Sequence, residues 1–329
     1  MIKTDQVVLV TGATGFIGHH LCRDLLSAGF KVRVLTRGKT RLELPSHHHL
    51  DSRLGDLLSA ETIASLCGGV DLIVHLAGHA HANDADDNYV HKINVLGTKS
   101  LLTTALSHGV KKFILISSSL AQAAERDDNR ATAYGFSKLE AERLVLHESE
   151  KGNIQASVLR PVNVYGEGMR GNISTLISFI SKGLIPRLPS LDTQISLLGV
   201  EDLIYAIRLV MDSEKANGET YLVTDGNKYS ISDIEKAIYS VLGKKIPRWA
   251  LPQIFLYLIM LSAQIMTKTL GFFKVRSPLT ENFGLKTYHN LVSENLFDNN
   301  KICEQLEFKP KSTFYDSLPK IVETLNSRV

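Results

Sequence analysis

Tyr134 and Lys138 are the residues whose types and spacing most directly suggest chemistry. They stand four residues apart in the run Tyr134-Gly135-Phe136-Ser137-Lys138, which opens a stretch rich in Leu, Ala and Glu that is typical of a helix. In a helix this spacing places both side chains on one face. A free phenol has a pKa of about 10, and a neighbouring ammonium favours the phenolate. The pair therefore predicts a tyrosine with a lowered pKa that transfers a proton as a general acid or base.

Three spaced glycines near the N-terminus predict a binding site for a dinucleotide. Gly12, Gly15 and Gly18 directly follow the apolar run Val7–Val10 and precede an amphipathic stretch. The first glycine permits a tight turn, the second allows the backbone to approach a pyrophosphate, and the third lets the helix pack closely against the strand. The N-terminus of such a helix attracts an anion. The predicted cofactor-binding residues of this turn are Gly12, Thr14, Gly15, Phe16, Ile17 and Gly18.

The first half of the chain alternates short apolar runs with amphipathic stretches. This pattern predicts a doubly wound, parallel Rossmann sheet of the α/β class, with helices on both faces. After Arg160-Pro161 the pattern loosens, which predicts a smaller C-terminal α/β domain for substrate binding. We expect the Rossmann domain to span residues 1–165 and the substrate-binding domain residues 166–329. A strand at 220–224 is expected to return to the first domain.

Composition excludes several classes of protein. The net charge of +3 is small and predicts no nucleic-acid binding. Three cysteines far apart in sequence, with no pattern of metal ligands, favour a reducing compartment and predict no metal site. The N-terminus carries no pattern typical of a signal peptide, so a cytoplasmic location is expected.

One apolar stretch, residues 254–266, has two interpretations. It is shorter than a membrane span, which needs about 20 apolar residues. The favoured interpretation is a helix buried in the C-terminal domain. The alternative is an interfacial helix that makes peripheral contact with a membrane, with Lys268 and Lys274 near the lipid head groups.

Together these motifs resemble the extended short-chain dehydrogenase/reductase family, also called the NAD-dependent epimerase/dehydratase family. The run Arg160-Pro161-Val162-Asn163-Val164-Tyr165-Gly166 and the segment Gly168–Asn172 resemble bacterial nucleotide-sugar 4-ketoreductases and 4-epimerases of the UDP-N-acetylquinovosamine type. The resemblance implies the catalytic set Asn94, Ser119, Tyr134 and Lys138, with Ser118 as the second choice for the active hydroxyl. It implies that the substrate contacts His81, Ser118, Ser119, Asn163 and Asn172.

The same resemblance extends the cofactor site to residues that follow the predicted strands. These are Thr36, Arg37, Asp56, Leu57, Leu76, Ala77, Gly78, Pro161 and Val162, together with Tyr134 and Lys138. NAD-preferring Rossmann domains usually carry an acidic residue where this chain has Thr36 and Arg37. A hydroxyl and a guanidinium suit a 2′-phosphate, so NADP(H) is favoured and NAD(H) stays open.

The resemblance implies a reductase of a 4-keto nucleotide sugar, with a UDP-sugar as substrate. A 4-epimerase that uses NAD is the main alternative, and a non-catalytic cofactor-binding assembly or sensor protein is the second. The chain departs from the family at Ile195, where an arginine often binds the diphosphate. Leu120-Ala121 replaces the acidic pair of the sugar dehydratases, which argues against dehydration. A homodimer through residues 89–107 and 137–148 is also implied.

Overall fold

The computed structural model describes residues 5–38, 44, 47–79, 87–128, 131–272 and 284–327. These residues form two compact units. Unit 1 contains residues 1–162, 200–224 and 298–310, and unit 2 contains residues 163–199, 225–297 and 311–329. The expected boundary lies after residue 165, with a strand at 220–224 returning to the first domain; the first segment of unit 1 ends at residue 162, and residues 200–224 and 298–310 also belong to unit 1.

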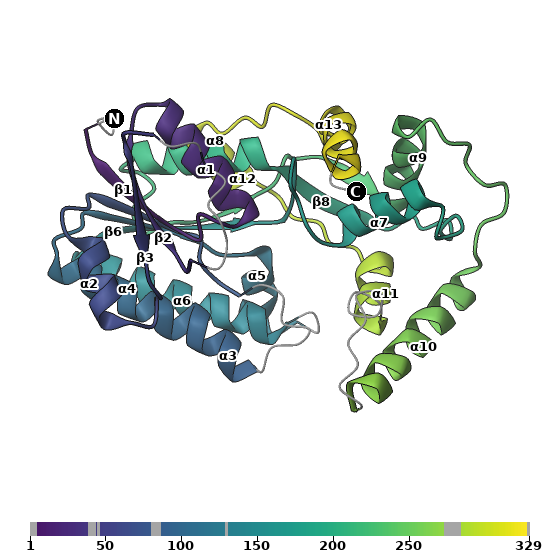
Figure 1. The fold of residues 1–329 in the computed structure, drawn as a ribbon, viewed down its shortest axis with the longest axis horizontal. Helices are drawn as coiled ribbons and strands as arrows, with labels where there is room; N and C mark the ends of the chain where they lie inside the picture. Colours follow the sequence, from purple (N-terminus) through teal and green to yellow (C-terminus); the bar gives the residue numbers. More distant parts are fainter. Residues whose placement is uncertain are drawn as a thin grey trace. The chain divides into compact units, whose positions relative to one another are not determined.

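Unit 1 is built on a parallel sheet of seven strands (Figure 1). The strand order is β3-β2-β1-β4-β5-β6-β9. The order reverses beside β1, which is where open α/β sheets bind their ligands. The strands are β1 (Val7–Thr11), β2 (Lys31–Thr36), β3 (Leu50–Leu54), β4 (Leu72–His75), β5 (Lys112–Ile116), β6 (Gln155–Pro161) and β9 (Thr220–Val223).

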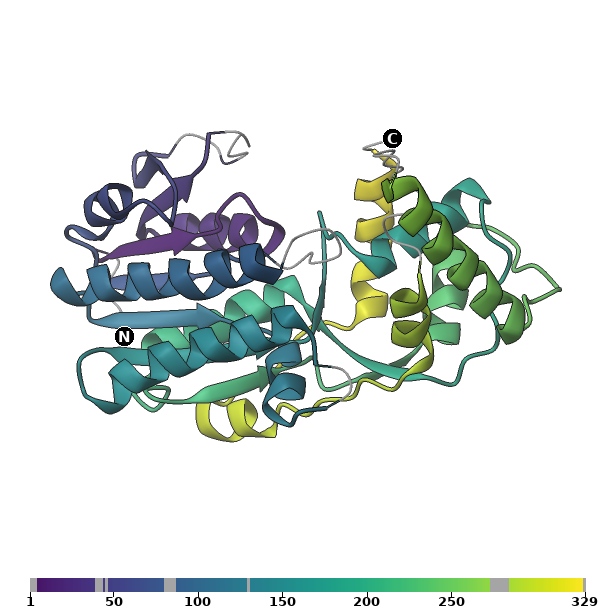
Figure 2. The same ribbon diagram turned by 90° about the horizontal axis from the view of Figure 1, so that it is seen from below.

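Helices cover both faces of this sheet, with α1 and α8 on one face and α2, α4 and α6 on the other (Figures 1 and 2). Strands β4 and β5 are buried along their whole length, because both of their faces are covered. The predicted fold class is therefore confirmed. The helices of unit 1 are α1 (Phe16–Ser27), α2 (Ala60–Cys67), α3 (Asp87–His91), η1 (Lys92–Leu96), α4 (Gly97–Ser107), α5 (Ser119–Glu125), α6 (Ala133–Glu150), α8 (Val200–Asp212) and α12 (Asn300–Leu306).

Unit 2 contains a three-stranded mixed sheet, in which β8 pairs with β7 in parallel and with β10 in antiparallel orientation. The buried carboxylate of Asp225 accepts hydrogen bonds from the hydroxyls of Tyr165, at 3.2 Å, and Tyr229, at 2.5 Å. The elements of unit 2 are β7 (Asn163–Tyr165), α7 (Asn172–Lys182), β8 (Gln194–Gly199), β10 (Lys228–Ser230), α9 (Ile231–Val241), α10 (Gln253–Phe272), α11 (Leu285–Val292) and α13 (Phe314–Asn326).

Helix α10 corrects the favoured interpretation of residues 254–266. Leu256 and Met260 are buried against Tyr288 and Leu291. Other apolar side chains on the helix stay about half exposed, including Phe255 at 54%. The expected helix is present but its burial is only partial, because an apolar run does not specify how many of its faces find a partner. No helix among the described residues is long and apolar enough to cross a membrane.

The turn between β1 and α1 shows why its glycines are needed. Gly12 has a φ of +75°, and a Cβ on it would lie 2.8 Å from the backbone nitrogen of Ala77. A Cβ on Gly18 would lie 2.2 Å from the carbonyl oxygen of Gly12. Gly12 therefore allows the turn to pack on the chain that follows β4, and Gly18 allows α1 to pack on the turn. No side chain caps the N-terminus of α1 at Gly15.

We predict that Gly18→Ala destabilises the protein by about 3 kcal/mol, because the new methyl group meets rigid backbone rather than a movable side chain. Gly68→Ala is the matched control, since a Cβ there meets nothing within 4 Å and φ is −58°. The control should change the free energy of unfolding by less than about 1 kcal/mol. Urea denaturation measures both variants, and equal stabilities would contradict the packing argument.

Candidate active site

Helix α6 presents Tyr134 and Lys138 on its first turns. Thr132 caps the helix by accepting a hydrogen bond from the Gly135 nitrogen at 3.0 Å. Lys138 is 4% exposed, and its ammonium donates to the carbonyl oxygen of Ile116, at the end of β5, at 2.7 Å. Tyr134 is half-buried. The predicted pair therefore lies at the carboxyl edge of the sheet.

Three consecutive serines follow β5, and the structure separates their roles. Ser118 acts to lower the pKa of Tyr134, and its oxygen accepts from the Leu120 nitrogen at 3.2 Å as the N-cap of α5. Ser117 donates to the carboxylate of Glu142. Ser119 is the buried first residue of α5. Ser119, the first choice for the active hydroxyl, and Ser118, the second choice, both stay predictions, and Ser118 is the one that affects the pKa of Tyr134.

The pKa of Tyr134 differs in direction from the sequence-based expectation. Burial raises it to about 12, and the hydrogen bond from Ser118 opposes this rise only in part. Burial also lowers the pKa of Lys138 to about 8, with the nearby Glu142 carboxylate acting in the opposite direction. The expectation was wrong because the Lys138 ammonium is held by the Ile116 carbonyl in the sheet edge instead of by the phenol.

Asn94 ties helix α6 to the chain that follows β4. It lies in the π-helical turn η1, and such turns occur frequently at functional sites. Its amide donates to Ser137 Oγ at 2.9 Å and to the His79 carbonyl at 3.3 Å. Its oxygen accepts from the His79 nitrogen at 2.7 Å. A Cβ on Gly78 would lie 3.1 Å from Asn94 Oδ1 and 3.8 Å from Lys138 Nζ, so a glycine keeps this approach open.

A chain of buried polar groups connects Asn94 to the glycine-rich turn. Thr98 donates to the Asn94 carbonyl at 2.6 Å, so its oxygen is left to accept from His75 Nε2 at 2.9 Å. His75 Nδ1 is then an acceptor for Thr11, 2.6 Å away. Thr11 in turn accepts from the Ala77 nitrogen at 3.2 Å. Burial, aided by the positive charge of Lys138, lowers the pKa of His75 to about 3 and keeps the ring neutral.

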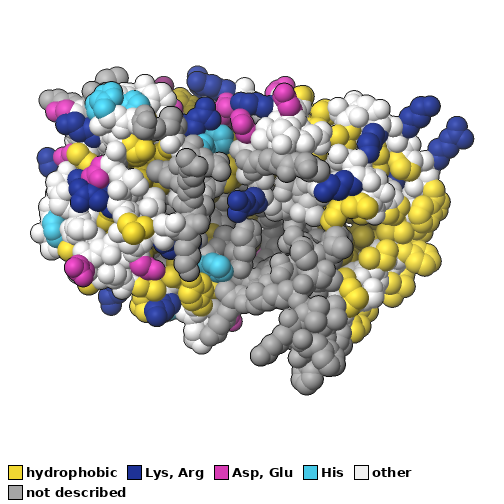
Figure 3. All heavy atoms as spheres, in the orientation of Figure 1, with side chains coloured by type: hydrophobic (Ala, Val, Ile, Leu, Met, Phe, Trp, Pro, Cys, Tyr) yellow, Lys and Arg dark blue, Asp and Glu magenta, His cyan; other side chains and the backbone are white. Residues whose placement is uncertain are grey.

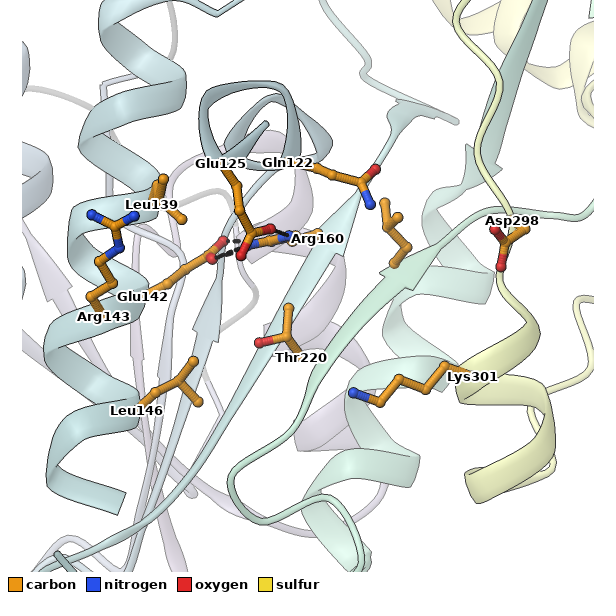
Figure 4. A pocket seen from close by; sticks show the side chains of 11 residues that line it. Gln122, Glu125, Leu139, Glu142, Arg143, Leu146, Arg160, Thr220, Asp298 and Lys301 are labelled. Carbon is orange, nitrogen blue, oxygen red and sulfur yellow. Dashed lines mark hydrogen bonds and ion pairs between the residues drawn. The ribbon is translucent and has the colours of Figure 1, made fainter. Parts of the chain in front are cut away.

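A pocket of about 390 Å³ lies beside α6, β6 and β9 and is centred on an ion-pair cluster (Figure 4). The guanidinium of Arg160 donates to Glu142 at 2.6 Å and to Glu125 at 2.7 Å. Glu142 is 1% exposed, so its charge is almost fully removed from water. None of the predicted site residues lines this pocket. The pocket is linked to the pair Tyr134 and Lys138 through Glu142, which lies one helical turn beyond Lys138.

The predicted cofactor residues of unit 1 follow the ends of parallel strands or lie in the glycine-rich turn. Thr36 ends β2 and Arg37 follows it, exposed; Leu76, Ala77 and Gly78 follow β4. Pro161 ends β6 and, like Val162, is buried. Asp56 accepts from the Leu58 nitrogen at 2.8 Å, and Leu57 is buried in the core. A turn with no room for Cβ atoms and an uncapped helix N-terminus fit a pyrophosphate.

Two of the predicted substrate residues, Asn163 and Asn172, belong to unit 2. Asn163 begins β7 and Asn172 begins α7, both exposed in unit 2. His81 lies outside the described residues. Among the residues that the structure describes, no group of three or more His, Cys, Asp or Glu side chains could hold a metal ion.

Several polar residues that organise the site were missed by the sequence analysis. They are Thr11, His75, Thr98, Ser137, Glu142 and Arg160. Each is buried. A signal existed for two of them: a histidine at the end of an apolar strand and a glutamate on the buried face of α6 are expensive to bury unless they are paired.

Comparison with known proteins identifies the class of this chain. The sequence profile described as "NAD dependent epimerase/dehydratase family" matches residues 8–224, which is more than half of the chain. The chain belongs to this family, and its cofactor is a nicotinamide adenine dinucleotide, NAD(H) or NADP(H). The resemblance inferred from the motifs is thereby confirmed at the level of the family.

Individual relatives are distant and differ in what they act on. The chain is 28% identical to a UDP-glucose 4-epimerase of Vibrio cholerae over 265 residues, which covers 76% of this chain and 79% of the relative. It is 24% identical to a 3-beta-hydroxysteroid dehydrogenase of Mycolicibacterium neoaurum, covering 95% of this chain and 89% of the relative. A Thermotoga maritima UDP-glucose 4-epimerase, solved with UDP-glucose, has a TM-score of 0.77 at 20% identity and covers 98% of this chain and 99% of its own.

We predict that His75 makes the protein less stable in acid. The folded state holds a pKa of about 3, whereas the unfolded state has the ordinary value of about 6.5. Between these values the unfolded chain binds a proton that the folded chain does not, so stability falls as the pH falls, by about 1.4 kcal/mol per pH unit. His75→Gln should remove this part of the slope between about pH 6 and pH 4.

Chemical denaturation at each pH measures the effect. The exposed His91 provides the matched control, because His91→Gln should keep the wild-type slope. Identical slopes for wild type and His75→Gln would show that the imidazole is not kept neutral by the fold.

Proposed function

We propose that this protein reduces a ketone to a secondary alcohol, with a 4-keto nucleotide sugar as substrate. One observation carries the proposal: Tyr134 and Lys138 lie on the first turns of α6, Lys138 donates to the Ile116 carbonyl at the sheet edge, and the Ser118 hydroxyl acts to lower the pKa of Tyr134. A carbonyl oxygen placed between the hydroxyls of Tyr134 and Ser118 would receive a hydrogen bond from each. The bound nicotinamide supplies the hydride to the carbonyl carbon.

In this proposal Tyr134 is the general acid. As the carbonyl carbon gains a hydride, its oxygen gains negative charge and takes the phenolic proton. Ser118 donates a hydrogen bond that stabilises this charge. Lys138, held at the Ile116 carbonyl, places a positive charge near the phenol and helps to return a proton to it after turnover. Asn94 positions α6 relative to Gly78.

The raised pKa of Tyr134 supports the direction of reduction. A pKa of about 12 keeps the phenol protonated at neutral pH, as a general acid requires. Oxidation of an alcohol begins instead with a tyrosinate base.

The 4-epimerase remains the second candidate, because it is supported by the match to the Vibrio cholerae UDP-glucose 4-epimerase. The two activities are separated by following the absorbance of the reduced nicotinamide with a panel of UDP-4-keto sugars. A reductase consumes NADPH or NADH in proportion to product. Interconversion of UDP-hexoses with no added cofactor would reject the reductase in favour of the epimerase.

We further propose that Asn163 and Asn172 in unit 2 contact the sugar or phosphate, together with His81. Ile195 is buried in β8 and offers no charge to a diphosphate. The exposed Arg170 is the nearest cation in sequence to Asn172, and we propose that it binds the diphosphate.

The exposed apolar side chains Leu96 and Phe136 support the expected dimer through η1, α4 and α6, which stays a prediction.

We predict that Tyr134→Phe lowers kcat about thousandfold, because the ring stays but the proton donor is lost. Ser118→Ala should lower kcat about hundredfold, and Ser119→Ala, the matched control, by less than about threefold. Steady-state kinetics and cofactor titration measure the three variants, with cofactor affinity expected to stay unchanged. A larger loss of kcat in Ser119→Ala than in Ser118→Ala would assign the active hydroxyl to Ser119. An unchanged kcat in Tyr134→Phe would support a non-catalytic cofactor-binding protein.

We also predict that Arg37 gives a preference for NADP(H). It follows β2 directly and is exposed, where a 2′-phosphate could pair with it. Arg37→Asp should weaken NADPH binding about tenfold or more while NADH affinity holds or improves. Fluorescence titration measures the affinity for both cofactors. Arg23→Asp, at an exposed position of α1, is the charge-matched control. Equal losses of affinity for NADPH and NADH would show that Arg37 does not contact the 2′-phosphate.

A further inference from the structure

We propose that the exposed face of α10 docks on the surface of an anionic membrane. This inference does not depend on the proposed reaction, since it concerns a surface of unit 2. The surface, here called the α10 face, consists of Ile246, Trp249, Ile254, Phe255, Leu258 and Ile259. Their side chains are between 41% and 61% exposed.

Helical spacing explains how one helix presents two apolar faces. Leu256 and Met260, one turn apart, pack against Tyr288 and Leu291 of α11. The pairs Ile254–Phe255 and Leu258–Ile259 repeat every four residues on a different face and stay exposed. Exposed apolar side chains scattered singly are ordinary, whereas a continuous patch marks an interaction surface. Figure 3 shows hydrophobic side chains gathered over the part of α10 that it colours.

The α10 face is presented by a helix that is fixed to its unit. Gln253 donates to the Tyr288 hydroxyl at 3.2 Å. Gln264 accepts from the Leu285 nitrogen at 2.9 Å, which ties α10 to the start of α11. Exposure of the face is therefore a property of packed secondary structure.

Charge identifies the occupant of the face. The sequence from 236 to 280 contains seven Lys and Arg residues and no Asp or Glu. Without those seven, the chain has 30 basic against 34 acidic residues, a net charge of −4. Lys245 and Arg248 are exposed beside Trp249, just before α10 begins. The exposed cations Lys245 and Arg248, next to an apolar and aromatic face, complement an anionic lipid surface, where each cation contributes about 1 kcal/mol.

A second copy of the chain fits this face less well. A two-fold interface would place the same face on itself, so the basic side chains of both copies, Lys245 and Arg248 among them, would lie at one interface. The segment 236–280 offers no carboxylate to pair with them. Helix α10 cannot span a bilayer, so the contact would be interfacial, with the apolar side chains entering the head-group boundary.

Vesicle flotation with the full chain tests the proposal. We expect the protein to float with vesicles of equal parts phosphatidylcholine and phosphatidylglycerol, and about tenfold less with phosphatidylcholine alone. The double variant Phe255→Glu/Leu258→Glu should lose binding about tenfold or more, because two charges replace the inserted side chains. Leu54→Glu, at a 73% exposed position of unit 1, is the matched control and should float as wild type does.

A second variant keeps the proposal testable if the first one misfolds. Lys245→Ser/Arg248→Ser leaves the apolar side chains in place and should lower binding to anionic vesicles alone, an effect that added salt mimics. Absence of wild-type flotation, or equal flotation of the α10 variants, overturns the proposal. Light scattering supplies a further check. A wild-type dimer that dissociates in Phe255→Glu/Leu258→Glu, without vesicle binding, would assign the face to a second copy.

Discussion

The buried ammonium of Lys138 is the group on which the site depends. Removing such a charge from water is unfavourable unless it is paired. Here it is compensated by the Ile116 carbonyl and by the charge of Glu142 one turn further along α6. Glu142 is compensated by Arg160, which also pairs with the half-exposed Glu125. Charges of alternating sign therefore extend from Lys138 to the surface, and each one requires the next.

The same ammonium also affects the neutral part of the site. Its positive charge helps to keep His75 unprotonated, which allows that ring to donate to Thr98 and accept from Thr11. This ordered chain fixes the end of β4 between the glycine-rich turn and η1. Gly12 and Gly78 permit the close approaches on either side. The glycine-rich turn and the first turns of α6 are thus connected by a single polar network, so a substitution that disturbs one is expected to disturb the other.

Local patterns in the sequence predicted the parts of the site that are set by local geometry. The glycine spacing and the four-residue step from Tyr134 to Lys138 are examples, because a turn and a helical face are decided within a few residues. The choice among Ser117, Ser118 and Ser119 depends on where α5 begins, and element ends are poorly specified by sequence. The partner of Lys138 could not be predicted either. An i, i+4 step places two side chains on one face without deciding whether the longer one turns toward its neighbour or the sheet.

Net charge and mean apolarity do not reveal that α10 has an exposed apolar face next to basic residues. A net charge of +3 suggested an even distribution, yet an acid-free segment of seven cations coexists with an acidic remainder. Mean apolarity likewise did not distinguish a helix packed on all sides from one that packs through Leu256 and Met260 and leaves a second face exposed. Both quantities lose information about position, and an amphipathic surface is defined by position. The pattern of exposed side chains around a helix, taken together with the sign of the charges at its end, is therefore the observation that assigns a partner to such a surface.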